Sequence, residues 1–487
     1  MPLTVSVQNL ERLDGLIEPM LEAARVPGAA VAVVAGGETV LARGYGYRDR
    51  EARLPTTSRT AYPIASTTKA LNATLLGMLV DEKRLAWSVP VQTYIPHFRL
   101  GDALTSAQVT VRDLLCMRTG LPRHDLVWMA NPMSRHELIE RLGHLDISSQ
   151  FRDKFQYNNL TVTAAGHVAE VVMGRSWEDL VLERILSPLG MARTSCTRPM
   201  SDDLTASYRE NSRREIEKSV LLAGEVTAPS GGAIYSTVED MARWMIFNLE
   251  GGIVRGRRLI EQSTLTELHS PQITAKTDPA CPTPHAAYAY GWFAYLYGGR
   301  ACLWHGGYLH DVQSEIILFP QDGLGVVSFI NFGYPGIAGV INQCVVQQLL
   351  GLAPMQTLQD KLGQYERKIA ENRERLAAVR QIHNTSPSHP VNAYTGTYAH
   401  AGYGHLEIRL SGQELYMHRG QLIVPLQHWH YDAWVAKEIN PFCFHAPHAF
   451  DRSSRMLFET SNDGEVCALT MRLEPAVAPI RFVKLNS

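Results

Sequence analysis

The stretch IASTTKALNATLLGMLVDEKRL, residues 64–85, places a serine and a lysine at the start of a long helical pattern. Its apolar spacing predicts one helix with Ser66 and Lys69 in the first turn. Side chains three residues apart share a helix face, so the amine can reach the hydroxyl. A serine becomes a nucleophile when a base takes its proton, and a lysine serves as that base when burial or nearby cations lower its pKa. The free N–H groups at a helix start also favour negative charge on a substrate oxygen.

Two further motifs follow this pair along the chain. Tyr157-Asn158-Asn159 stands just before a helical segment, where a phenol and an amide can project from one loop into a cleft. The segment LWHGGYLHD, residues 303–311, ends a strand with His305-Gly306-Gly307, and the two glycines let an extended substrate approach the strand backbone. Taken alone, each motif has a plain alternative: a capping serine with a surface lysine, a hydrogen-bonded turn, and a chance H-x-G like that at 418–420.

The composition is that of a globular enzyme. The chain has 487 residues, 45% of them hydrophobic and 19% charged, which excludes a disordered or collagen-like protein. This length predicts two domains, because single cores rarely grow past about 250 to 300 residues. The formal net charge of -2 gives no support for nucleic acid as a partner, and the scattered histidines show no metal-ligand spacing. We therefore expect neither a metal nor another cofactor.

Alternating helical and strand patterns predict an α+β domain. An apolar run at 29–35 and the segment TVLARGYGY after Gly36-Gly37 predict a β-hairpin near the start of the chain. Helices are expected around 111–116, 136–142, 162–173 and 238–249, and strands at 290–297, 302–304, 312–319 and 325–330. Strands at both ends with helices between them indicate one antiparallel sheet, flanked by helices, whose halves are separated by a helical insertion.

A second domain is expected beyond residue 390. Between residues 355 and 380, apolar residues recur at alternating steps of four and three, which predicts one helix with a single apolar seam. We interpret it as a connector packed on the main domain, with an intermolecular coiled coil as the alternative. The segment HNTSPSHP, 383–390, predicts an exposed linker, and short alternating runs after it predict a small closed or nearly closed all-β barrel. The predicted division is 1–354, 355–389 and 390–487.

In combination and in this order, the three motifs resemble the serine β-lactamases and penicillin-recognising enzymes. The branch they resemble is class C-like and peptidase S12-type, with DD-peptidases, D-aminopeptidases and esterases. The resemblance also includes VPGAAVAVV, VTVRDLLCMRTGLPRHD, LSPLGM and APSGGAIYSTVEDMARWM, and covers roughly residues 10–350. It implies a β-lactamase/transpeptidase-like fold. The barrel is similar to the lipocalin-like domain that accompanies some members.

The resemblance implies roles for the motif residues. Ser66 would be the acylated nucleophile, Lys69 its base, and Tyr157 the relay that carries the proton to the leaving group. The backbone N–H groups of Ser66 and Tyr308 would form the oxyanion hole. Asn159 would orient the amide of the substrate.

The third motif departs from the pattern of the family. His305 stands where many members carry a lysine, ahead of Gly306 and Gly307, which would line the substrate. A histidine lacks a permanent positive charge, so its charge would depend on pH and a β-lactam carboxylate would bind weakly. Leu309-His310-Asp311 falls where relatives often have Pro and Gly, and His310 is expected at the rim of the cleft.

These features predict a serine hydrolase that forms an acyl-enzyme on Ser66 and acts on peptide amides or esters. The resemblance implies a preference for D-amino acids. The alternatives are a penicillin-binding-protein-type thioesterase, which cyclises peptides, and a non-catalytic binding protein on the same fold. The expected partner is a small-molecule or peptide substrate, and the sequence predicts no oligomeric state.

The compartment is predicted from the cysteines and the first residues. Seven cysteines are an odd number and lie far apart, which indicates free thiols in a reducing compartment. The first residues lack the basic start and unbroken apolar run of a signal peptide. No stretch approaches the roughly 18 to 20 apolar residues of a membrane span. We therefore expect a cytoplasmic protein that does not enter a membrane.

Overall fold

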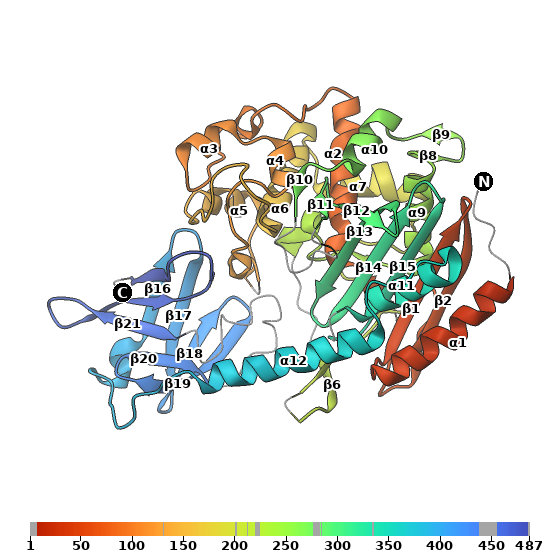
Figure 1. Ribbon diagram of the computed structural model, residues 1–487. Coiled ribbons are helices and arrows are strands. Elements are labelled where there is room, and N and C mark those ends of the chain that lie inside the picture. Colours follow the sequence, from red (N-terminus) through yellow and green to blue (C-terminus); the bar gives the residue numbers. More distant parts are fainter. Residues whose placement is uncertain are drawn as a thin grey trace.

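The chain forms a mixed α/β body and a barrel, joined by one long helix (Figure 1). The computed structural model describes residues 7–129, 131–199, 202–211, 213–219, 225–275, 283, 285–333, 336–437 and 455–485. Two of the seven cysteines, Cys281 and Cys443, lie outside these residues. The five that are described carry free thiols.

A nine-stranded antiparallel sheet forms the centre of the α/β body. Its strands, in spatial order, are β10 (Ile273–Thr274), β11 (Ala287–Tyr288), β12 (Phe293–Tyr297), β13 (Arg300–Leu309), β14 (Val312–Phe319), β15 (Leu324–Ile330), β1 (Gly28–Ala35), β2 (Glu38–Asp49) and β3 (Leu54–Pro55). Because β1 pairs with β15, the first and last strands of this body meet in the middle of one sheet. The prediction of one sheet in two halves, separated by a helical insertion, is confirmed.

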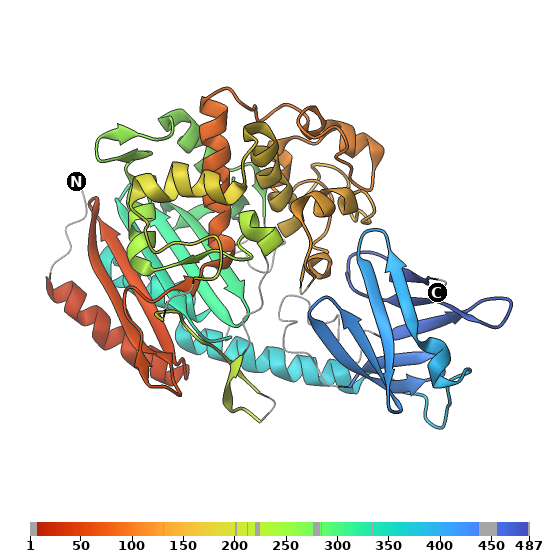
Figure 2. The same ribbon diagram turned by 180° about the vertical axis from the view of Figure 1, so that it is seen from behind.

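The sheet is covered on both faces. All eight residues of β1 are buried, because alternating side chains enter two different apolar cores. One core includes Val31 and Val33 with α1 (Val7–Ala23) and α11 (Ile337–Leu350), which lie on the face shown in Figure 1. The view from behind in Figure 2 shows helices of the insertion in front of the other face. A nearly continuous apolar run is what a strand buried on both sides requires.

The insertion between the two halves of the sheet is mostly helical. Its helices are α2 (Lys69–Asp81), α3 (Ala103–Gln108), α4 (Val111–Leu115), α5 (Arg135–Leu142), α6 (Asn159–Met173), α7 (Trp177–Val181), α8 (Ser187–Leu189), α9 (Val238–Leu249) and α10 (Gln262–His269). Short strand pairs join them: β4 (Tyr62–Pro63) with β7 (Tyr235–Ser236), β5 (Ser207–Glu210) with β6 (Ile216–Ser219), and β8 (Ile253–Val254) with β9 (Arg257–Arg258).

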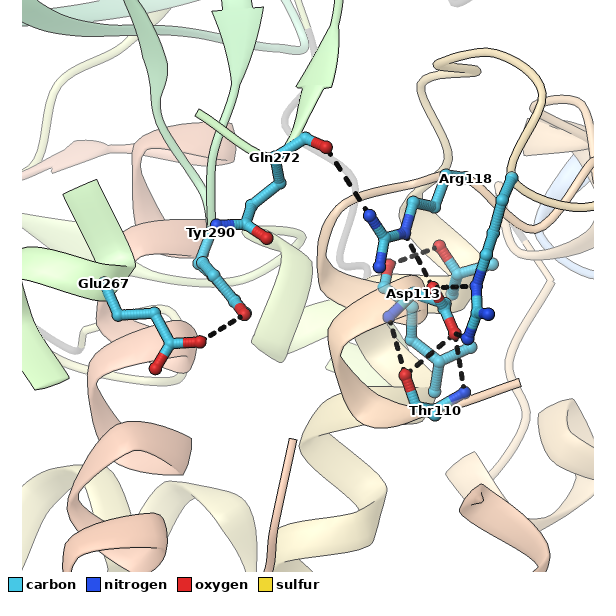
Figure 3. A network of polar contacts seen from close by, with 9 residues as sticks. Thr110, Asp113, Arg118, Glu267, Gln272 and Tyr290 are labelled. Atoms are coloured by element: carbon cyan, nitrogen blue, oxygen red, sulfur yellow. Dashed lines mark hydrogen bonds and ion pairs between the residues drawn. The ribbon is translucent and has the colours of Figure 1, made fainter. Parts of the chain in front are cut away.

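A buried carboxylate organises this insertion. Asp113 accepts hydrogen bonds from Arg118 at 2.6 Å, from Arg152 at 2.7 Å and from the Thr110 hydroxyl at 2.8 Å (Figure 3). Burial acts to raise the pKa of Asp113, but these donors hold it below its ordinary value. The backbone N–H of Arg152 also donates to the backbone carbonyl of Arg118. The network therefore holds the loop that leads to Tyr157.

The helix α12 (Leu358–Ala377) leads from the α/β body to the barrel (Figures 1 and 2). Leu358, Leu362 and Tyr365 pack against the core of the main body, which confirms a connector packed on that body. The barrel consists of β16 (Gly396–His400), β17 (Gly404–Ser411), β18 (Glu414–Arg419), β19 (Leu422–His430), β20 (Ala433–Ala436), β21 (Met456–Thr460), β22 (Val466–Met471) and β23 (Ile480–Lys484). Pairing of β16 with β23 closes it, as predicted.

Several predicted boundaries differ from the structure. Ser66 lies in a 3₁₀ turn, Ala65–Thr68, and α2 begins only at Lys69. The strand predicted at 302–304 extends to Leu309, because β14 pairs with it through both glycines. In the described part of the chain, no helix has the length and apolarity to cross a membrane. The division at residues 354 and 389 stays a prediction.

Candidate active site

Ser66 is presented by a strained turn rather than by a regular helix. The preceding residue, Ala65, has φ 47, a left-handed conformation that alanine rarely adopts. Gly231 packs directly against this turn, since a Cβ on it would lie 1.9 Å from the Ala65 carbonyl oxygen. The close approach of the Gly231 backbone therefore holds the turn that carries the hydroxyl.

The Ser66 hydroxyl lies between an amine and a phenol. Lys69 Nζ is 2.8 Å from Ser66 Oγ, and the Tyr157 hydroxyl donates to the same oxygen at 2.7 Å. Ser66 is partly exposed, whereas Lys69 is fully buried. The spacing of three residues brings the Lys69 amine to the Ser66 hydroxyl, as expected, and the tyrosine comes from 91 residues away.

The hydrogen bonds of Lys69 suit an uncharged amine. Its Nζ donates to Asn159 Oδ1 and to the Ser230 carbonyl, both at 2.8 Å. These two oxygens can only accept, so a neutral amine uses both its protons there and turns its lone pair toward Ser66. Burial, aided by the Arg123 guanidinium and opposed by the Asp125 carboxylate, holds the pKa of Lys69 well below its ordinary value. The site therefore favours a lysine that can accept a proton.

Asn159 is held in one orientation by the protein. Its Oδ1 accepts from Lys69, and its Nδ2 donates to Asp125 Oδ1 at 2.9 Å. Asp125 in turn accepts from Arg123 at 2.7 Å and from the Trp128 indole at 3.1 Å. Both polar ends of the Asn159 amide are thus engaged, one by Lys69 and one by Asp125. Its role toward the substrate amide stays a prediction.

The ring of Tyr157 lies close to two basic side chains. The Arg123 guanidinium is 4.8 Å and the Lys69 Nζ 4.9 Å from the centre of its ring. Cations over an aromatic face are attracted to it and compensate negative charge that develops on the phenol oxygen. This environment suits a group that passes a proton between Ser66 and a leaving group.

His305 is buried and neutral. Its Nδ1 lies 2.7 Å from the Gly306 carbonyl and its Nε2 3.2 Å from the Tyr288 hydroxyl. The carbonyl can only accept, so we assign the proton to Nδ1 and the accepting role to Nε2. Burial, with the nearby Lys69 charge, lowers the pKa of His305 to about 3. The expectation that its charge changes within the usual pH range is therefore wrong, because the ring sits in an apolar environment.

Strand β13 has an open edge beside Ser66. The pairing of β12 with β13 ends at Phe293 and Trp304, whereas β14 pairs with β13 as far as Leu309. Beyond Trp304, β13 can therefore offer backbone groups to an extended substrate on the β12 side. The two glycines differ here: a Cβ on Gly307 would lie 3.0 Å from the Ser66 nitrogen, whereas one on Gly306 would meet only the Trp304 ring.

The hairpin tip after β13 forms part of the cleft rim. His310 and Asp311 both have positive φ, 45 and 65, which makes a tight two-residue turn between β13 and β14. His310 lines the cavity, as predicted for a rim residue. The Tyr308 hydroxyl donates to Asp311 at 2.7 Å, so the side chain of Tyr308 is engaged in the hairpin. Its backbone role in an oxyanion hole stays a prediction.

The site opens into a cavity of about 990 Å³. Its wall includes Ser66 and Trp304 from the α/β body, Lys361 from α12 and Glu474 from the barrel. All three parts of the chain thus surround the space in front of the nucleophile. A cavity of this size accommodates a peptide-sized ligand.

Several residues that contact the site lie outside the three sequence motifs. Arg123, Asp125 and Ser230 contact Lys69, Tyr157 or Asn159. These three residues lie in the segments RTGLPRHD and APSGG, which carry the family resemblance. The resemblance alone assigned no role to an individual residue in either segment. No spacing rule predicts these contacts, since they join residues far apart in the sequence.

Fold and site together define a serine hydrolase. Residues 13–343 match the family described as Beta-lactamase, so the chain belongs to that family. Residues 380–484 match a domain of unknown function, DUF3471. The fold prediction, a β-lactamase/transpeptidase-like domain followed by an all-β barrel, is confirmed.

Two curated proteins and one solved structure are similar to this chain. An unguisins hydrolase, ungD′, of Aspergillus campestris (strain IBT 28561) is 29% identical over 441 residues, which cover 85% of this chain and 80% of that protein. Protein flp of Staphylococcus aureus (strain NCTC 8325 / PS 47) is 25% identical over 363 residues, 73% of this chain and 70% of that protein. The octameric penicillin-binding protein homologue from Pyrococcus abyssi shares the fold, with a TM-score of 0.63 and 22% identity over 98% of this chain and 100% of that chain.

Proposed function

We propose that this chain cleaves peptide amide or ester bonds through an acyl-enzyme on Ser66. The observation that carries the proposal is the position of the Ser66 hydroxyl, within hydrogen-bond distance of both Lys69 and Tyr157. A buried lysine with a lowered pKa can take the serine proton, and the phenol can return it to the leaving group.

The proposed reaction has two stages. In the first, Ser66 Oγ bonds to the substrate carbonyl carbon, its proton moves to Lys69, and the oxyanion is stabilised by the N–H groups of Ser66 and Tyr308. As the carbon–leaving-group bond breaks, Tyr157 gives its proton to the leaving amine or alcohol and takes the proton held by Lys69, so both groups return to their starting state. In the second stage, water attacks the ester carbonyl and gives a proton to Lys69. The bond between Ser66 Oγ and the acyl carbon then breaks, Ser66 Oγ receives that proton, and the acid is released.

The substrate class is proposed from relatives and from the cavity. The similar Aspergillus proteins are named as hydrolases of unguisins, and the open edge of β13 suits an extended peptide. We propose a preference for a D-configured residue next to the scissile bond on the basis of the family resemblance. We also propose a cytoplasmic protein that needs no cofactor and binds neither nucleic acid nor membranes.

Intact-protein mass spectrometry tests the reaction. The protein is exposed separately to peptide thioesters, D- and L-amino-acid amides and penicillin. A mass increase that peptide mapping places on Ser66, and that is absent from Ser66→Ala, is the expected result. An adduct on another residue, or near-parental turnover by Ser66→Ala, would refute the assignment.

The same samples distinguish the acyl acceptor. Chromatography of the products from a linear peptide thioester separates the free acid from the cyclic peptide. We expect free acid, because water is the default acceptor where no second amine is positioned. Predominantly cyclic product would favour the peptide-cyclase alternative, and binding without turnover or adduct would favour a non-catalytic binding protein.

A further inference from the structure

The barrel contacts the segment that carries two of the site residues. Glu474 accepts a hydrogen bond from the His124 backbone N–H at 2.9 Å, and the Tyr403 hydroxyl pairs with His124 Nδ1 at 2.7 Å. Arg419 donates to the Val127 carbonyl at 3.4 Å. The barrel therefore holds the segment 124–127 from one side by both its backbone and a side chain.

These contacts are buried and tightly packed. Tyr403, Arg419 and Glu474 have exposed fractions of 0%, 4% and 7%. The turn before Tyr403 inserts into the α/β body, where a Cβ on Gly402 would lie 3.0 Å from the His144 carbonyl oxygen. One continuous apolar core includes residues of both the barrel and the main body. The barrel therefore packs tightly against the α/β body at the segment 124–127, and the three polar side chains that contact this segment are buried.

The residues on either side of His124 connect the barrel contacts to Lys69, the proposed catalytic base. His124 stands between Arg123 and Asp125 in the chain and has φ 45, so the backbone bends sharply at this point. Asp125 fixes the amide of Asn159, whose oxygen accepts from Lys69. Arg123 lies over the ring of the proton relay and lowers the pKa of the base. A displacement at His124 therefore moves Arg123 and Asp125, and both of these side chains affect the pKa of Lys69.

We propose that Tyr403, Arg419 and Glu474 of the barrel are positioning residues for acylation. They hold the turn at His124, so that Asp125 orients Asn159 toward the base. The proposal rests on the proposed function, because it assigns these residues to the chemistry at Ser66. It gives the barrel a task in the reaction that differs from contact with the substrate.

Paired substitutions in the full-length protein test this role. Tyr403→Phe removes the hydroxyl that meets His124, whereas Tyr398→Phe removes a barrel hydroxyl that donates to the Tyr394 carbonyl, at 2.8 Å and away from the segment. Glu474→Gln weakens the acceptor for the His124 N–H, and Glu459→Gln is its control within the barrel. Tyr403→Phe and Tyr398→Phe each remove one hydroxyl contact, whereas the carboxylates of Glu474 and Glu459 each accept two hydrogen bonds that a glutamine weakens. The pairs therefore separate positioning from barrel stability.

The measured quantity is the rate constant for acylation of Ser66 by p-nitrophenyl acetate as a function of pH. This small ester reaches few parts of the cavity, so lost substrate contacts do not explain a slower rate. We expect Tyr403→Phe and Glu474→Gln each to slow acylation about tenfold, because small displacements of catalytic groups carry large rate costs. The controls should keep the parental rate.

The pH profile supplies a second readout. The charged or titratable groups that face Lys69 include Arg123, Asp125, Tyr157 and His305. Loosening the segment admits water and moves Arg123 and Asp125 away from Lys69. Burial and Arg123 lower the pKa of Lys69 more than Asp125 raises it, so the net effect is a higher pKa of the base. The midpoint of the acidic limb should therefore move to higher pH in the Tyr403 and Glu474 variants.

The outcomes separate the two proposals. If the parental protein forms no ester on Ser66, the proposed function fails. If the parental protein acylates and the test variants match their controls in rate and pH midpoint, the positioning role alone is refuted. Equal slowing in test and control variants, in step with a fall in thermal midpoint, would also refute it, because barrel stability would then account for the effect.

Discussion

Gly307→Ala should disable the site by steric displacement. A Cβ at this position would lie 2.3 Å from Ser314 Oγ, 2.6 Å from the Ile64 carbonyl oxygen and 3.0 Å from the Ser66 nitrogen. The Ser314 side chain can rotate, although it would give up its hydrogen bond to Ile64. The Ile64 oxygen belongs to the backbone that leads into the nucleophile turn, so it must move by about 0.8 Å to restore ordinary contact.

That displacement sets the expected magnitude. A misplacement of about 1 Å costs roughly 100-fold in rate, and loss of one oxyanion-hole donor costs about 100- to 1,000-fold. We therefore expect Gly307→Ala to slow acylation of Ser66 at least about 100-fold. Overpacking should also reduce the free energy of unfolding by about 1–3 kcal/mol. Acylation by p-nitrophenyl acetate and thermal denaturation measure the two effects separately.

Gly306→Ala is the matched control. Its Cβ would meet only ring carbons of Trp304, at 3.2 and 3.4 Å, and a side chain can give way. This variant should keep most of the parental rate. Equal loss in the two alanine variants, or near-parental acylation by Gly307→Ala in a folded protein, would refute the reasoning from β13 and the Ser66 turn.

Two further predictions concern the buried side chains of Lys69 and His305. Lys69→Ala should reduce acylation about as much as Ser66→Ala, and the double variant should be no worse than either, because nucleophile and base act as a unit; additive losses in acylation assays would contradict this. For His305, the folded-state pKa of about 3 lies below the ordinary 6.5, so the unfolded chain binds the proton first. The free energy of unfolding should therefore fall as the pH decreases from about 6.5 toward 3. In denaturant titrations, His305→Gln should reduce this fall, and the acidic midpoint of acylation should not change.

Much of the catalytic centre could be predicted because it is encoded locally. Ser66 and Lys69 are three residues apart in the sequence. The two glycines after His305 indicate a strand whose backbone an extended substrate can approach closely. The structure brings these residues together, with Tyr157 from a third segment. The 3₁₀ turn at Ser66 was not predicted, because apolar periodicity does not distinguish it from the first turn of α2.

The long-range contacts could not be derived from the sequence. Asp125 meets Asn159 across 34 positions, and Glu474 meets His124 across 350. Neither pair has a local pattern: the first depends on how a loop and α6 of the insertion fold together, and the second on how the barrel packs against the α/β body. In the same way, Arg214, between β5 and β6, forms an ion pair with Glu366 of α12 across 152 positions.

The residue at position 305 supplies no charge to bind the carboxylate of penicillin. A β-lactam carboxylate needs a cation in front of the nucleophile, but His305 is neutral and buried, with an exposed fraction of 1%. Arg123 is already paired with Asp125. A lysine at position 305 would be desolvated beside Lys69, so His305→Lys should lower the pKa of the base rather than create an anion site.

We therefore expect penicillin to acylate Ser66 more slowly than a D-amino-acid amide or a thioester of similar size. We also expect His305→Lys to leave this order unchanged. Competition for Ser66 between penicillin and a D-amino-acid amide or peptide thioester, followed by intact mass in the parental protein and in His305→Lys, measures both. Faster acylation by penicillin than by the peptide substrates would show that another cation reaches the carboxylate, and would move the assignment from peptidase toward β-lactamase.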